Sequence, residues 1–255
     1  MKKSFSPLFL VALFIAAIFQ SCSNNPQANA EMKKPAEQVN TASDATLENE
    51  DSEEGKSADA TSGTAQNTNI NDLNNKNLQD AFKGETTASA KYLAYSQKAE
   101  AEGFHEIALL FKATSLSEKI HANNHRAVLE ENGQKIPVIT PEFTVKSTAE
   151  NLKDAIEGEG YEITTMYPEF ITAANTAGDQ LSLVSLNYAY KTEKKHKPLY
   201  EKALQALQSN NVKSLASIYY VCPTCGNTYD TSIPKRCGIS MTTAEKFVKI
   251  DNLNL

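Results

Sequence analysis

The chain has 255 residues, of which 22% are charged and 40% hydrophobic, and its formal net charge is −6. This length accommodates one or two domains with a buried core. The acidic balance is uneven, because residues 23–70 contain nine acidic and three basic side chains and so carry a charge equal to that of the whole chain. No cluster of basic residues stands out, which argues against nucleic acid as a partner.

The first 22 residues have the composition of an export signal. Lys2 and Lys3 precede an unbroken run of twelve apolar residues from Leu8 to Phe19, which is too short to span a membrane and is typical of a signal peptide. Cys22 follows, where lipoprotein processing would cut the chain and acylate the cysteine. We therefore expect an exported lipoprotein of a bacterial envelope, facing the periplasm and anchored to a membrane through Cys22. The alternative is an ordinary signal peptide with an incidental cysteine.

Residues 23–70 contain no aromatic residue and are dominated by Asn, Ala, Ser, Thr and Glu. Such a segment has too little apolar surface to offset the entropy that is lost on ordering. We expect a disordered acidic tether here. A helical bundle over residues 71–212 and a small domain over residues 213–255 are predicted to follow it.

Two closely joined helices are predicted first in the bundle. Apolar residues recur at helical spacing from 77 to 103, and Glu85 lies inside this apolar stripe. The second helix is predicted from 106 to 132, and its inward face carries Glu118 and His121 in a Glu-x-x-His pattern. Both helices therefore bring metal-ligating residue types toward the core.

A third helix is predicted from about residue 148, after a connection that contains two prolines. Its inward positions include Glu159 and Glu162. Pro168 lacks an amide donor, so a kink or break is expected where it falls in this helix.

The fourth helix is predicted from 181 to 207 and repeats the Glu-x-x-His pattern at Glu193 and His196. Two helices, a long connection and two more helices are typical of an all-α, ferritin-like four-helix bundle with one long crossover. Residues three apart share a helix face, so each Glu-x-x-His pair can offer an oxygen and a nitrogen to one ion. Five buried glutamates would repel one another without cations, which favours a dinuclear metal site over a set of solvated charges.

Three further cysteines lie near the C-terminus, at Cys222, Cys225 and Cys237. A CxxC pair and a third cysteine within so short a segment favour a bound metal. The alternative is a disulfide between two of the three, since an oxidising compartment stabilises disulfides.

With these residues in view, the chain from 77 to 255 resembles rubrerythrin. The resemblance rests on AFKGE at 81–85, EKIH at 118–121, GEGYE at 158–162, MYPEF at 166–170 and EKKH at 193–196. It implies two iron ions in the bundle, and it implies that the third helix tolerates Pro168.

The resemblance also implies the roles of individual residues. The iron ligands would be Glu85, Glu118, His121, Glu159, Glu162, Glu193 and His196. In the family, one iron exchanges a glutamate for a histidine between redox states, and that pair would be Glu162 and His121 here. Tyr92 and Tyr167 match family tyrosines that hydrogen-bond near the carboxylates. His125 matches no ligand position, and we interpret it as a packed or solvated histidine rather than a group that supports the ligands.

The C-terminal segment resembles the rubredoxin domain of the same family, in which two CxxC knuckles hold one iron. Ser240 stands where the fourth cysteine belongs. Cys222, Cys225 and Cys237, with Ser240 as a fourth group, are therefore predicted to hold one iron or zinc ion. The departure at Ser240 puts an electron relay from this site in doubt.

By the same resemblance, the expected activity is that of an oxidoreductase of the peroxidase type, which reduces hydrogen peroxide to water in oxidative stress defence. The alternative is an iron- or zinc-binding lipoprotein, or a ferroxidase, without peroxidase turnover. The electron donor is not identified by the sequence. A homodimer is expected because family members commonly pair through their bundles.

Overall fold

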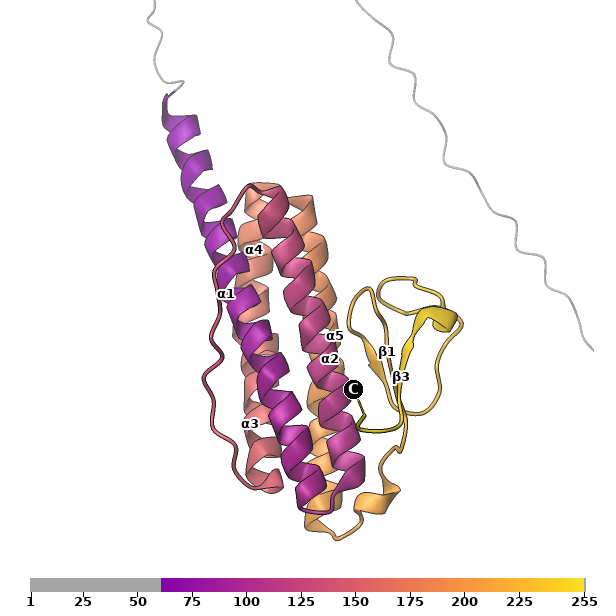
Figure 1. The fold of residues 1–255 in the computed structure, drawn as a ribbon. Helices are drawn as coiled ribbons and strands as arrows, with labels where there is room; N and C mark the ends of the chain where they lie inside the picture. Colours follow the sequence, from indigo (N-terminus) through magenta and orange to yellow (C-terminus); the bar gives the residue numbers. More distant parts are fainter. Residues whose placement is uncertain (1–60, 255) are drawn as a thin grey trace, which may run out of the picture. The chain divides into compact units, whose positions relative to one another are not determined.

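The computed structural model describes residues 61–254 (Figure 1), and the predicted signal peptide, Cys22 and most of the predicted tether lie outside this range. No helix within the described range is long and apolar enough to cross a membrane.

The first two helices, α1 (Thr61–Ala101) and α2 (His105–Glu131), form an antiparallel hairpin. Gly103 joins them with a φ of 84°, a conformation that glycine adopts without strain. The prediction that the tether continues to residue 70 was wrong, because α1 already begins at Thr61. Extending an existing helix adds one hydrogen bond for each residue that is fixed, so polar residues can join a helix that packing has nucleated further along.

A connection without helix or strand, residues 132–147, then runs along the bundle to α3 (Thr148–Tyr161). Ser147 starts α3 with a capping box: its side chain accepts from the backbone N–H of Glu150, and the Glu150 side chain accepts from the backbone N–H of Ser147. The cap satisfies two of the backbone donors that a helix start leaves without intrahelical partners. This is the long crossover that the sequence predicts.

The expected distortion near Pro168 is a π-helical turn, η1 (Glu162–Met166), inserted between α3 and α4 (Tyr167–Ala177). Pro168 falls in the first turn of α4, where a missing N–H costs little. The helix direction therefore continues through the proline, as the family resemblance implied. Gly178 ends α4 with a φ of 71°.

The last helix of the bundle, α5 (Gln180–Gln208), begins at Asp179, whose side chain accepts from the backbone N–H of Ser182. Pro198 lies inside α5, which the sequence reading did not anticipate. α5 packs against α2, α3 and α4, so the four helical rods form one bundle. Two apolar clusters fill it: one includes Tyr92, Phe111 and Tyr200, and the other includes Leu78, Leu129 and Leu186.

The C-terminal segment forms a small antiparallel sheet that packs on α2 and α5. The segment contains η2 (Val212–Ser214), β1 (Tyr219–Val221), β2 (Thr228–Tyr229), η3 (Ala244–Lys246) and β3 (Val248–Ile250). The strand order in the sheet is β2-β1-β3. Val221 pairs with Thr228 on one side and with Val248 on the other. The three cysteines of this segment lie buried beside the sheet, in a cluster with Phe247.

Candidate metal centre

A cluster of buried acidic and imidazole side chains lies inside the bundle, between the two apolar clusters along the helices. Each bundle rod supplies part of it: α1, α2, α3 and α5 bring six of the seven predicted ligands together, namely Glu85, Glu118, His121, Glu159, Glu193 and His196. Each of the six side chains is at most 2% exposed. The helical spacing seen in the sequence explains this, because each residue falls on the inward stripe of its helix.

The six residues form two adjacent groups of candidate ligands that share two carboxylates. One group is Glu85, Glu118, His121 and Glu193, and the other is Glu118, Glu159, Glu193 and His196; within each group the candidate ligand atoms lie within 4.8 Å of one another. Glu118 and Glu193 belong to both. Carboxylates with two oxygens can bridge two ions, so the arrangement suits a dinuclear centre.

In each shared carboxylate, one oxygen lies near His121 and the other lies near His196. Nδ1 of His121 lies 2.9 Å from Oε2 of Glu118 and 2.8 Å from Oε1 of Glu193. Nδ1 of His196 lies 3.1 Å from Oε1 of Glu118 and 2.7 Å from Oε2 of Glu193. The two halves of the centre are therefore related by an approximate symmetry, with one histidine in each.

Apart from the close contacts among themselves, the candidate ligand atoms that face this centre have no hydrogen-bond partners among the described residues. These atoms are Glu85 Oε2, both side-chain oxygens of Glu118 and of Glu193, Glu159 Oε2, and Nδ1 of His121 and of His196. A buried polar atom without a partner is costly, and most such atoms in proteins are satisfied. Eight of them converging on two adjacent points fit two metal ions, because oxygen and imidazole ligands suit iron as well as other first-row metals.

The pKa values of the clustered side chains are also consistent with a metal site. Burial raises the pKa of Glu85 to about 7 and raises the pKa of Glu159 well above its usual value, an effect that the neighbouring Glu193 strengthens. Burial lowers the pKa of His196, but the negative charges of Glu118 and Glu193 outweigh this and raise it to about 9. Protons therefore occupy several of these groups near neutral pH, and a metal ion that binds here displaces them.

Glu162, the seventh predicted ligand, stands apart from the other six. It lies on the π-helical turn, is half-buried, and belongs to neither group of convergent ligand atoms. Its side chain lines a pocket of about 380 Å³ between α1 and the α3–η1 segment, together with Tyr92, Lys83 and Lys91. Burial, followed by repulsion from Glu85 and Glu193, raises the pKa of Glu162 well above its usual value. Glu162 therefore shares a surface pocket with Tyr92, and none of the six convergent ligands lines it.

Both predicted tyrosines bind carboxylates of the centre. The Tyr92 hydroxyl donates to Oε1 of Glu159 at 3.0 Å, and the Tyr167 hydroxyl donates to Oε1 of Glu85. Each bond leaves the second oxygen of the carboxylate free for a metal ion. Burial raises the pKa of both phenols well above their usual value, so both retain their protons.

The outer nitrogens of the two histidines bind the C-terminal segment, which the sequence reading missed. Nε2 of His121 lies 3.1 Å from the carbonyl oxygen of Cys225, and because a carbonyl only accepts, His121 must donate there. Nε2 of His196 lies 3.1 Å from Oγ1 of Thr228, whose hydroxyl already donates to the carbonyl oxygen of Gly226. Because Nε2 donates in both rings, Nδ1 of each histidine faces the centre and is the nitrogen that would lose its hydrogen and bind a metal ion.

Gly226 is the point of closest approach between the two regions. A Cβ atom at this position would lie 2.4 Å from Nε2 of His121 and 2.5 Å from Oγ of Ser117, and the φ of Gly226 is +76°. The Ser117 hydroxyl donates to the carbonyl oxygen of Gly226 at 2.8 Å. Only glycine fits both this contact and this backbone conformation. Such backbone proximity leaves no periodic signal in a sequence.

The three C-terminal cysteines are free and buried, so the disulfide alternative is not what the structure contains. Their sulfurs converge, with Sγ of Cys225 3.4 Å from Sγ of Cys237. Oγ of Ser240 lies 3.2 Å from Sγ of Cys222, next to the cluster as the alignment of Ser240 with a fourth ligand predicts. A hydrogen bond from Cys225 is the largest cause that lowers the pKa of the Cys222 thiol, to about 4. Three sulfurs and a hydroxyl suit a tetrahedral zinc or iron ion.

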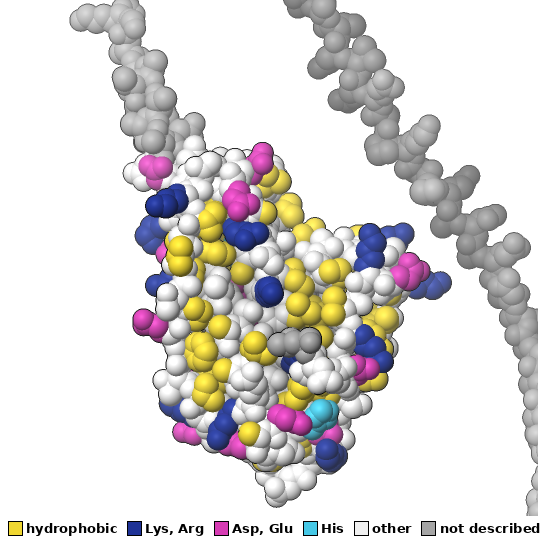
Figure 2. Space-filling model, viewed as in Figure 1, with side chains coloured by type: hydrophobic (Ala, Val, Ile, Leu, Met, Phe, Trp, Pro, Cys, Tyr) yellow, Lys and Arg dark blue, Asp and Glu magenta, His cyan; other side chains and the backbone are white. Residues whose placement is uncertain are grey.

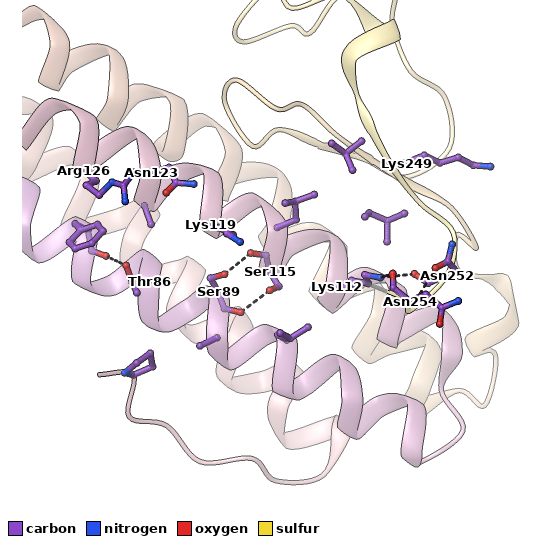
Figure 3. A pocket seen from close by; sticks show the side chains of 18 residues that line it. Thr86, Ser89, Lys112, Ser115, Lys119, Asn123, Arg126, Lys249, Asn252 and Asn254 are labelled. Atoms are coloured by element: carbon purple, nitrogen blue, oxygen red, sulfur yellow. Dashed lines mark hydrogen bonds between the residues drawn. The ribbon is translucent and has the colours of Figure 1, made fainter. Parts of the chain in front are cut away.

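A larger pocket than the one beside Glu162 lies elsewhere, on the outer face of α1 and α2 beside β3. Figure 3 shows it from close by. Its volume is about 710 Å³, and it is lined by apolar side chains and by the cations of Lys112, Lys119, Arg126 and Lys249. Apolar side chains gather on this face in Figure 2. None of the predicted site residues lines this pocket, so size alone does not identify the chemically active region here.

Comparisons with known proteins agree with this arrangement. Residues 76–204 match the model of the Rubrerythrin family. The chain is 34% identical to Rubrerythrin-2 of Clostridium acetobutylicum over 172 residues, which cover 67% of this chain and 92% of that protein. It is 30% identical to nigerythrin of Nitratidesulfovibrio vulgaris, over 68% of this chain and 84% of the relative.

Solved structures are similar as well. A structure of nigerythrin in the fully reduced, all-ferrous state superposes with a TM-score of 0.62 at 29% identity, and the match covers 69% of this chain and 86% of that one. This confirms the predicted ferritin-like helical fold. Six predicted ligands converge in the bundle, the fold is shared, and the sequence match covers half of the chain: this protein belongs to the rubrerythrin family.

Proposed function

We propose that this protein is a di-iron oxidoreductase that reduces hydrogen peroxide to water in oxidative stress defence. The observation that carries the proposal is the pair of ligand groups that share Glu118 and Glu193, with donor atoms that lack hydrogen-bond partners. Glu85 and His121 would complete one iron site, and Glu159 and His196 the other. Two ferrous ions at this spacing would supply the two electrons that cleavage of one peroxide O–O bond consumes.

Peroxide reduction to two water molecules also consumes two protons, and the chain offers proton donors at both ends of the centre. The phenol of Tyr92 hydrogen-bonds to Glu159 and the phenol of Tyr167 to Glu85. Both groups are protonated acids next to ligand carboxylates, which is the position that general acid catalysis requires. We assign Tyr92 and Tyr167 to this role.

The pocket beside Glu162 is the proposed entrance for peroxide, because Tyr92 lines it together with Glu162, the only one of the seven predicted bundle ligands that is partly exposed. Glu162 and His121 are the proposed pair that exchange at one iron between redox states. His121 belongs to one of the convergent ligand groups and Glu162 to neither, which is the arrangement expected for one of the two states. The π-helical turn supports the exchange, since such turns lack the regular hydrogen bonding of the helix and occur frequently at functional sites.

A single substitution tests this exchange. In Glu162→Ala the other six ligands remain, so we expect two irons to bind in the bundle while peroxide turnover slows by about tenfold or more. Single-turnover oxidation of the iron-loaded protein measures the rate, and metal analysis measures the content. Wild-type turnover in Glu162→Ala would show that the exchange does not operate here.

The cysteine knuckle, defined as Cys222, Cys225, Cys237 and Ser240, is proposed to be a rubredoxin-like site that holds one iron or zinc ion. Iron there would be well placed to pass electrons to the bundle, because the backbone carbonyl of Cys225 accepts a hydrogen bond from His121. Zinc has no redox chemistry and would make the knuckle purely structural. The donor that would reduce the protein is proposed to be an envelope component of unidentified chemistry.

A second candidate function is metal binding or ferroxidase activity without peroxidase turnover. Ser240 favours it, because a hydroxyl is a harder and much less acidic ligand than a thiol and a knuckle that contains it is a poorer electron relay. Anaerobic stopped-flow oxidation of the iron-loaded protein, with peroxide and with oxygen in separate runs, distinguishes the candidates. Faster oxidation by peroxide supports the peroxidase, and faster oxidation by oxygen supports the ferroxidase.

Two further proposals concern location and assembly. We propose export and anchoring through an acylated Cys22, which mass spectrometry of the membrane fraction would detect as a lipid-modified N-terminal peptide. We also propose a homodimer, supported by the apolar face of α1 and α2 around the 710 Å³ pocket. Sedimentation of the purified protein tests it, and Leu93→Glu, in that face, should shift the protein toward the monomer.

A further inference from the structure

His125 is a buried histidine that the proposed mechanism does not use. It lies on α2 one turn beyond His121, is 0% exposed, and belongs to neither group of candidate metal ligands. Both of its ring nitrogens have polar partners: Nδ1 lies 2.8 Å from Oγ of Ser185 on α5, and Nε2 lies 3.3 Å from the hydroxyl oxygen of Tyr167 on α4. The imidazole therefore links two helices.

The direction of these hydrogen bonds follows from the number of hydrogens. The Tyr167 hydroxyl has one hydrogen, which it donates to Oε1 of Glu85. Its oxygen must then accept from His125, so Nε2 carries the hydrogen. In a neutral ring the other nitrogen, Nδ1, is an acceptor, and Ser185 must donate to it. The result is a chain of hydrogen bonds in which each group donates to the next, from Ser185 through His125 and Tyr167 to Glu85.

The surroundings keep His125 neutral, as this direction requires. Burial lowers the pKa of His125 to about 3. Ser185 is 4% exposed, so water has little access to compete for Nδ1. The Tyr167 side chain is 0% exposed, so its oxygen is stabilised as the proton leaves by protein groups rather than by water.

We propose that His125 is a positioning residue for the Tyr167 hydroxyl: fixed by Ser185, it donates to the phenol oxygen, directs the phenol hydrogen at Glu85 and stabilises the negative charge that develops on the oxygen as this proton passes to Oε1 of Glu85. The hydrogen bond from His125 strengthens the one from Tyr167, because hydrogen bonds in a row polarise one another. The proposal rests on the function proposed above. It replaces the sequence-based interpretation of His125 as a merely packed or solvated residue.

The first arm of the test does not depend on activity. The full chain, labelled with ¹⁵N-histidine and loaded with redox-inert zinc, is studied by long-range ¹H–¹⁵N NMR; with four histidines in the chain, the His125 signals are identified by their loss in His125→Gln. We expect a neutral ring with its hydrogen on Nε2 between about pH 6 and 8, and loss of this single tautomer in Ser185→Ala. A hydrogen on Nδ1, or a charged ring, would overturn the proposal.

The second arm measures peroxide turnover of the iron-loaded chain. His125→Leu removes the donor, and we expect its kcat to fall about tenfold or more with little change in KM, the size typical of losing a partner of a ligand. His125→Gln keeps an N–H close to the position of Nε2 and should restore turnover to within about threefold of wild type. His105→Leu, at a partly exposed histidine paired with Glu100, is the matched control.

The outcomes separate this proposal from the proposed function. Equal turnover in His125→Leu and wild type, or an equal loss in His125→Leu and His125→Gln, would contradict the positioning role. If wild type itself reduces no peroxide, the proposed function fails, and the NMR arm still decides whether His125 directs the Tyr167 hydroxyl.

Discussion

The two candidate metal sites of this protein differ in how completely they are built. The bundle centre has two ligand groups related by an approximate symmetry, and both contain Glu118 and Glu193. The cysteine knuckle offers three convergent thiols, and the Ser240 hydroxyl lies 3.2 Å from Sγ of Cys222. Because Glu118 and Glu193 belong to both groups, two ions in the bundle would depend on each other, whereas the knuckle has no ligand in common with the bundle.

Loss of a shared carboxylate should therefore have the largest effect of any single change. In Glu118→Ala both ligand groups lose a member, and we expect the bundle to fall from two metal ions per chain to well below one. Metal analysis of purified protein measures this. Glu162→Ala is the matched control, since Glu162 lies outside both groups. Retention of one full equivalent in Glu118→Ala would show that the two ions bind independently.

Metal affinity of the bundle should rise with pH. The pKa of Glu85 is raised to about 7 and that of His196 to about 9. Below these values the groups hold protons that a metal ion must displace, so affinity is lowest at acidic pH, increases through the range from about 6 to 9, and levels off above it. The slope should be about tenfold per pH unit for every proton displaced. Competition with a zinc chelator, corrected for the chelator's own titration, measures it; a flat profile would contradict the protonated centre.

A single methyl group added at Gly226 should disrupt the contact between the C-terminal segment and His121 in the bundle. Gly226→Ala places a Cβ against His121 at a positive φ, so we expect the free energy of unfolding to fall by at least about 1 kcal/mol. Binding of metal in the bundle should weaken as well, because His121 must move. Gly238→Ala is the control, since a Cβ there meets nothing within 4 Å. Denaturant unfolding and zinc titration of both variants compare them.

The smallest change in metal content is expected at the knuckle. Ser240→Cys would complete four thiolates and should alter the visible absorption of iron bound there, while the bundle keeps its two ions. Ser240→Ala removes the hydroxyl and should weaken knuckle binding without abolishing it. A wild-type spectrum already typical of four thiolates, unchanged in Ser240→Cys, would show that Ser240 does not occupy the fourth position.

The sequence predicted the bundle, and the convergence of six of its seven candidate ligands, because both depend on local spacing. Glu118 and His121 are three residues apart on one helix face, and such a pair points inward wherever the apolar stripe does. The start of α1 at Thr61 was missed, since the polar residues there have no stripe of their own. The interior proline of α5, Pro198, was also overlooked.

Contacts between distant segments were beyond the sequence. Nothing in the spacing of Cys225 or Gly226 indicates that these backbones lie against His121, and nothing near His125 indicates Ser185 or Tyr167 as partners. These contacts depend on how the C-terminal sheet and α4 pack on the hairpin of α1 and α2. They determine which nitrogen of each histidine faces the metal centre.

If two metal ions bind in the bundle and share Glu118 and Glu193, anomalous diffraction from crystals of the iron-loaded protein should show two iron peaks per chain inside the bundle, about 3.5–4 Å apart as in other two-metal sites. Each peak should be in contact with both shared carboxylates and with one of the two histidines. A single peak in the bundle, or two peaks that share neither glutamate, would rule out a dinuclear centre held by these residues.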